Sequence, residues 1–350
     1  MKFIFLFLGI LGLIGAAFAA IARTVDPRDD FGAGICPQVT MDSRRDKMRL
    51  FKDYMAAGPV GGLILGSSRS MKLDPKQLES ELAVRFFNFS VDSGRAEDFL
   101  AIYRWVRRQG VTLRVLVLGL DVEALHDDDV SDHRLRENGE LLAALGARGG
   151  AEGALERVAA AAGKYTGMFT AAYVKDVARS LARCLRQSGK PGAAIESDPD
   201  GYLRYVKLER QRATGTFDLD RQIADSLEEY VIRFRDMRGL SPRRQQDLEQ
   251  LIREAKADGA AVKVWITTLH PTTARYVGAR TAYAELLSRT RQYLAHLRDA
   301  FAIDVYDYSD PGRYGGSLGG WYDGAHIDET NAGLVAAGLA GPGQRGGRQE

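Results

Sequence analysis

Five short apolar runs, separated by segments long enough for helices, constrain the fold of this 350-residue chain more than any other feature. Each run has the length of one buried strand, and the third is apolar enough for both of its faces to be covered. Strands that alternate with helices predict a parallel sheet between two helical layers. We therefore expect a three-layer α/β/α fold with a parallel five-stranded sheet. The predicted strands are 62–66, 84–91, 113–120, 261–268 and 303–308.

The amino end differs from the rest because no charge occurs between Phe3 and Ala22. Twenty apolar residues can just span a bilayer as a helix, while residues 17–20 (AFAA) also fit a small-residue cleavage site of an export signal. Residues 1–23 are therefore either an uncleaved anchor, which we favour, or a cleaved signal. We expect the remaining chain on the periplasmic or extracellular side of the cytoplasmic membrane, or secreted if the signal is removed.

The rest of the chain divides by composition. Residues 24–60 are interpreted as a juxtamembrane connector and a lead-in helix, and 61–340 as one α/β domain. Within that domain, residues 127–258 show helical periodicity without strand signals, which predicts a helical insertion between two strands. The Gly- and Arg-rich residues 341–350 are predicted to be a disordered tail.

Charge and cysteine content narrow the function classes. The 48 basic and 46 acidic residues nearly balance, which argues against a nucleic-acid partner. No Cys/His spacing suggests a structural zinc site, so we expect no metal. Cys36 and Cys184 could pair in an exported protein, but their spacing does not decide whether they meet.

A candidate nucleophile follows the first predicted strand. The run 61–65 breaks at Gly66-Ser67-Ser68, which places hydroxyls at the carboxyl edge of the sheet, where open α/β folds keep their sites. Ser68 needs a base and oxyanion donors to act, and its own backbone N–H is one such donor. A chemically silent Gly-Ser-Ser turn that caps a helix is the alternative.

The matching base lies near the carboxyl end. In Asp323-Gly-Ala-His326, a turn can set the carboxylate against one imidazole nitrogen while the other nitrogen faces the serine. A surface turn is the alternative, but the preceding Gly-rich loop and the strand-end serine favour the catalytic interpretation. Serine, histidine and aspartate form the simplest set for nucleophilic catalysis.

These motifs, in this order, resemble the SGNH (GDSL-type) hydrolase superfamily. Gly66-Ser67-Ser68 occupies its first block, with serine in the aspartate position, as in the membrane-anchored branch that includes the teichoic acid D-alanine transfer protein and polysaccharide O-acetylation proteins. Residues 88–94 (NFSVDSG) loosely match its second block, and Asp323 and His326 match its last. The resemblance implies Ser68 as nucleophile, His326 as base, Asp323 as orienter and the Gly94 N–H as an oxyanion donor.

The third block departs from the family pattern. Where Gly-x-Asn-Asp is expected, the chain has Gly119-Leu120-Asp121 and no asparagine. Either Asn88 supplies a side-chain donor, or the oxyanion hole is reduced to backbone groups, or Asp121 has another role. Losing one such donor costs about 3 kcal/mol in the barrier where it has been measured.

Further residues near the same sheet edge are weaker substrate-binding candidates. Arg69 could bind an anionic group or pair with a surface acid, and His270 fits a loop residue better than a second base. Trp321 and Tyr322 could form a sugar-stacking platform or pack in the core.

The resulting functional hypothesis is an exported, membrane-tethered serine esterase or O-acyltransferase that needs no cofactor. Its expected substrate is an acyl ester, with acetyl as the favoured acyl group, on an envelope polysaccharide. The alternative is an inert carbohydrate-binding or assembly subunit with envelope protein partners, which the missing asparagine favours. A flavodoxin-like phosphate site at Ser67-Ser68 is weaker, because it leaves Asp323 and His326 without a role.

Overall fold

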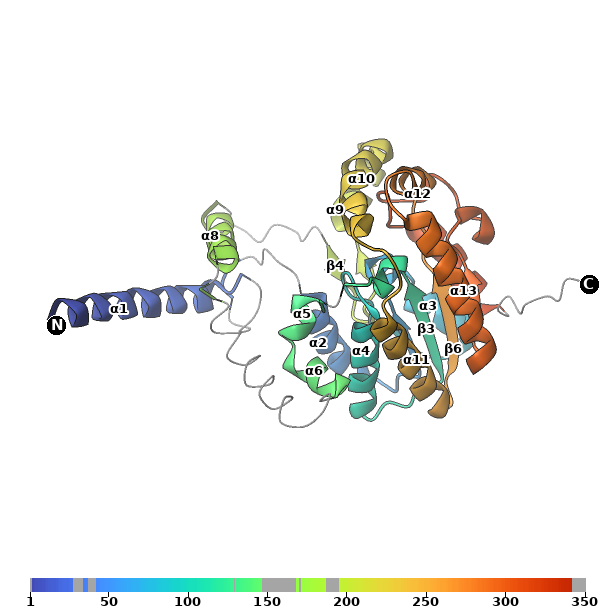
Figure 1. The fold of residues 1–350 in the computed structure, drawn as a ribbon, viewed down its shortest axis with the longest axis horizontal. Helices are drawn as coiled ribbons and strands as arrows, with labels where there is room; N and C mark the ends of the chain where they lie inside the picture. The colour runs from blue at the N-terminus through green and yellow to red at the C-terminus, as the bar shows by residue number, and fades with distance from the viewer. Residues whose placement is uncertain are drawn as a thin grey trace, which may run out of the picture. The chain divides into compact units, whose positions relative to one another are not determined.

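A computed structural model describes residues 2–27, 34–36, 42–128, 130–146, 168–169, 171–186 and 195–341 of the chain. The chain forms two compact units (Figure 1). The first comprises residues 1–43 and 136–192, and the second comprises 44–135 and 193–350.

The second unit is built on a five-stranded parallel sheet in the order β2-β1-β3-β6-β7, which confirms the predicted fold class. All six residues of β3 are buried, because helices cover both faces of this central strand. The strands are β1 (Gly62–Leu65), β2 (Phe86–Asn88), β3 (Val115–Leu120), β6 (Ala261–Ile266) and β7 (Asp304–Asp307).

Helices form a layer on each side of this sheet. On one side, α3 and α14 pack together over a core that includes Ile64, Val117 and Trp265. On the other, α4 and α11 lie side by side (Figure 1), and α11 also contacts α13. The helices of the sheet layers and their lead-in are α2 (Ser43–Ala56), α3 (Pro75–Leu82), α4 (Ala96–Arg108), α11 (Pro242–Ala257), α13 (Tyr283–Phe301) and α14 (Glu329–Ala340).

The remaining elements of this unit flank the carboxyl edge of the sheet or connect to it. A two-residue antiparallel pair, β4 with β5, lies inside the block that was predicted to lack strands. These elements are η1 (Ser68–Ser70), η2 (Val122–Leu125), α5 (His133–Arg136), β4 (Glu196–Ser197), β5 (Leu203–Arg204), α9 (Val206–Ala213), α10 (Leu219–Arg235), α12 (Pro271–Gly278) and η3 (Pro311–Tyr314).

The predicted helical insertion, 127–258, divides between the two units. Residues 136–192 belong to the first unit, whereas α11 packs against α4 and β6 and so forms part of the sheet's own helical layer. Residues 151–162 of this insertion lie outside the described residues, as does nearly all of the predicted tail at 341–350.

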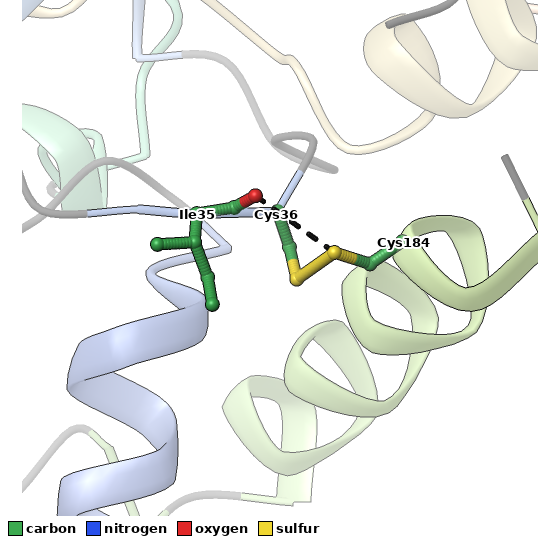
Figure 2. Close-up of a disulfide and its surroundings, with 3 residues drawn as sticks. All are labelled: Ile35, Cys36 and Cys184. Carbon is green, nitrogen blue, oxygen red and sulfur yellow. Dashed lines mark hydrogen bonds between the residues drawn. A yellow bond between two sulfur atoms is a disulfide. The ribbon is translucent and has the colours of Figure 1, made fainter. Parts of the chain in front are cut away.

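The first unit contains α1 (Lys2–Val25), α6 (Gly139–Leu145) and α8 (Ala171–Arg186). Its stretch from Phe5 to Val25 is long and apolar enough to span a membrane or to act as a signal sequence. A disulfide joins Cys36 to Cys184 in α8, with the two Cα atoms 5.1 Å apart, and the Cys184 Sγ lies 3.8 Å from the Ile35 carbonyl oxygen (Figure 2). The pairing that the sequence left open is therefore made.

Candidate active site

The turn after β1 positions Ser68. Ser67 caps η1 by accepting the Arg69 N–H at 3.1 Å, and Ser68, half-buried, is the first residue of this short turn. A side chain at Gly66 or Gly119 would overlap the Ser70 hydroxyl, so the turn crosses the end of β3 at a distance that only glycine allows. The hydroxyl of Ser68 is thereby held at the carboxyl edge of the sheet.

Three side chains from opposite ends of the chain form a hydrogen-bonded series there. The Ser68 Oγ lies 2.9 Å from the His326 Nε2. The His326 Nδ1 lies 2.9 and 2.8 Å from the two carboxylate oxygens of Asp323. Asp323 Oδ1 also accepts the backbone N–H groups of Ala325 and His326, at 2.8 and 2.9 Å, which fixes the turn itself.

The electrostatics of this series suit a base that works near neutral pH. Burial alone would raise the pKa of Asp323, but His326 and the two backbone N–H groups outweigh it and lower that pKa to about 2. Burial and the nearby Arg69 and Arg233 lower the pKa of His326, but the Asp323 carboxylate outweighs them, so the pKa lies above its ordinary value. Asp323 is thus ionised, and its carboxylate stabilises the imidazolium that forms when His326 takes a proton.

A charged cleft of about 450 Å³ opens beside Ser68. Three arginines and five acidic side chains line it, so it fits a polar substrate better than an apolar one. Helix α10 supplies one wall, including Arg233, whose side chain is 35% exposed, and the exposed Ile232.

Arg69 and Asp121 both line this cleft, but each is held by neighbours. The buried Arg69 guanidinium pairs with Glu123 and lies 3.8 Å from Asp121. Asp121 accepts the Thr267 hydroxyl at 2.7 Å. Burial opposes the charge on Arg69, yet the two acids outweigh it and raise the pKa of the guanidinium. Arg69 therefore stays charged, and its guanidinium is a fixed part of the cleft lining.

The predicted oxyanion donors differ in their surroundings. The Ser68 N–H opens η1, where the first N–H groups have no partner within the turn. Gly94 lines the cleft, but its N–H donates to the Val91 carbonyl at 3.1 Å. Asn88 is fully buried, and its amide donates to the Ser70 and Leu73 carbonyls, each at 2.9 Å. The Asn88 side chain therefore stabilises the η1 turn, and its amide N–H groups are already used in these hydrogen bonds.

His270 and Trp321 do not line the cleft. His270 caps α12 by accepting the Thr272 N–H at 3.2 Å. Its ring packs edge-on against the Trp321 ring, with the two ring centroids 5.4 Å apart. Trp321 is fully buried in the core cluster, with its Nε1 donating to the Ser317 carbonyl at 3.2 Å. Trp321 packs in the core, so its ring faces are unavailable to a sugar.

Two residues that sequence reasoning missed, Tyr205 and Arg212, contact the Asp323–His326 turn or the residues beside it. The Tyr205 ring lies 6.0 Å from the His326 ring and 4.9 Å from the Tyr322 ring. Arg212 donates to the Trp321 carbonyl and to the Asp328 carboxylate, on either side of the turn. Neither residue belongs to a motif, because their role comes from where α9 packs.

Among the described residues, no group of three or more His, Cys, Asp or Glu side chains is arranged to hold a metal ion. No protein-family model matches this chain, and no curated protein matches it significantly.

Proposed function

We propose that the chain is a serine-dependent esterase or O-acyltransferase of the SGNH kind that cleaves acyl esters of an envelope polysaccharide. The observation that carries this proposal is the continuous series from the Ser68 hydroxyl through His326 to Asp323, beside an open polar cleft. Three such groups in hydrogen-bond contact are what nucleophilic acyl chemistry needs.

The proposed reaction has two steps. The Ser68 Oγ attacks the ester carbonyl as its proton passes to the His326 Nε2, and the alcohol leaves with that proton, so an acyl-serine remains. A water molecule or a sugar hydroxyl then gives its proton to His326 and takes the acyl group, which restores the Ser68 hydroxyl. Asp323 keeps its charge throughout and stabilises the imidazolium.

Two features support a site of action outside the cytoplasm. The helix α1 fits a membrane span or a signal, and the disulfide is typical of oxidising compartments. We propose that α1 anchors the chain in the cytoplasmic membrane, with the α/β unit on the far side.

A second candidate is an inert binding or assembly subunit with the same fold. The donors favour it: the Gly94 N–H is bonded to Val91 and the Asn88 amide to two carbonyls, which leaves fewer groups to stabilise an oxyanion.

The Ser68→Ala variant separates the two candidates. We expect it to lower turnover of p-nitrophenyl acetate by about 10⁴-fold or more and to abolish labelling by a fluorophosphonate, with an unchanged melting temperature. Ser70→Ala is the matched control, because the Ser70 hydroxyl is buried two residues away without a hydrogen-bond partner among the described residues. Full activity in Ser68→Ala, or no labelling of the wild-type protein, would eliminate the proposal that the chain is a serine-dependent enzyme.

A further inference from the structure

The helix α8 has three faces of different character. Its buried face, including Tyr173 and Val177, packs against the carboxyl end of α1. Because successive helical residues are about 100° apart, Val174, Leu181 and Leu185 project within about 40° of one another. These three side chains are 42%, 38% and 80% exposed, so they form an exposed apolar stripe along α8.

Basic residues occupy the third face. Lys175, Arg179 and Arg183 are exposed and lie between the stripe and the side opposite it. Arg179 is 3.7 Å from Asp176 and 56% exposed, an ion pair too open to remove its charge from the surface. A helix with an apolar stripe beside a basic face is typical of helices that lie in a membrane interface.

The attachment of α8 places it where α1 would leave a bilayer. The Phe169 ring, just before α8, lies 5.8 Å from the Phe18 ring. Ala22 and Val25 of α1 are buried in the same cluster, and Arg23 is the first charge after the apolar span. The disulfide fixes the other end of α8 to Cys36, beyond the end of α1.

We propose that α8 is an interfacial membrane helix. Val174, Leu181 and Leu185 enter the boundary of the acyl chains, while Lys175 and Arg179 meet lipid phosphates. The same packing requires that α1 be retained, because its removal would expose the buried face of α8, including Val177. This inference is independent of the acyl chemistry at Ser68.

Tryptophan scanning in the full-length protein tests the orientation. Leu185→Trp and Arg179→Trp differ by about 120° around α8, and the native Trp105, Trp265 and Trp321 are buried and common to both. In vesicles of phosphatidylglycerol and phosphatidylcholine with brominated acyl chains, we expect the added fluorescence of Leu185→Trp to be quenched at least twofold more than that of Arg179→Trp. Leu181→Trp repeats the test at a second stripe position.

Equal quenching at both faces would overturn the proposal. So would an unquenched stripe that a second copy or another protein covers, which chemical cross-linking in the same vesicles would reveal. Intact mass of the membrane-extracted protein checks the retention of α1: we expect residues 1–22 to be present, and their loss refutes the inference.

Discussion

Arg212→Met tests whether residues 195–217 hold the Asp323–His326 turn in its working position. The Arg212 guanidinium donates to the Trp321 carbonyl and the Asp328 carboxylate and lies 4.6 Å from the Tyr322 ring centre. Methionine keeps most of the apolar length but removes every donor. The substitution therefore removes the link on both sides of the turn while leaving its own sequence unchanged.

The expected cost follows from the burial of these groups. A hydrogen bond to a charged group contributes about 1.5–3 kcal/mol, and Arg212 makes two. The Arg212 side chain is 27% exposed, and this partial solvent screening favours the lower end of the range. The Asp328 carboxylate keeps the Asn331 N–H at 3.0 Å. We expect a loss of about 3 kcal/mol in the free energy of unfolding, or roughly 6–12 °C in melting temperature for a unit of this size.

Circular dichroism melts and the rate of fluorophosphonate labelling at Ser68 measure the two consequences. We expect labelling of Arg212→Met to slow at least tenfold at a temperature where the protein is folded, and Arg212→Lys to recover part of the rate. The matched control is Arg204→Met, which removes an exposed arginine paired with Glu209 in the same segment. If Arg212→Met behaves like Arg204→Met in both assays, the proposed role of Arg212 is wrong.

Three other predictions concern single groups. Asp323→Asn should lower esterase turnover by about 10²–10⁴-fold, and because the carboxylate raises the pKa of His326, the acid limb of the pH–rate profile should move to lower pH; an unmoved limb contradicts this. Gly119→Ala should destabilise the protein by about 1–3 kcal/mol, since the new methyl group overlaps the Ser70 hydroxyl, and Ser70→Gly should restore part of that loss in urea unfolding. Burial lowers the pKa of Lys47 from 10.5 to about 7. Between these two pH values the unfolded chain binds more protons than the folded protein, so this group makes the free energy of unfolding increase as the pH rises. Lys47→Met should flatten that dependence, and an identical slope in the two proteins would refute the assignment.

The sheet and the serine–histidine contact could be anticipated because local sequence defines each strand and each of the two turns. Apolar runs of strand length define the sheet, and parallel strands bring their carboxyl ends to one edge. Ser68 directly follows such a strand, and the Asp-x-x-His turn supplies its own geometry. The Ser68–His326 contact, between residues 258 positions apart, then followed from shared placement at that edge.

Roles set by packing could not be anticipated in the same way. Asn88 looked like a donor, but its amide faces two carbonyls of the η1 turn. Trp321 adjoins the Asp323–His326 turn in sequence, yet its ring lies in the core. The contribution of Tyr205 and Arg212 depends on where α9 lies, which no periodicity in that segment reports.

The disulfide has a topological effect on how this protein tolerates proteolysis. Cys36 and Cys184 close a ring of chain that contains Ser68 but not His326. A single cut anywhere inside that ring would leave two fragments still joined through sulfur, and α1 would remain attached to the fragment that carries His326. Only a reducing agent would then let the two fragments part.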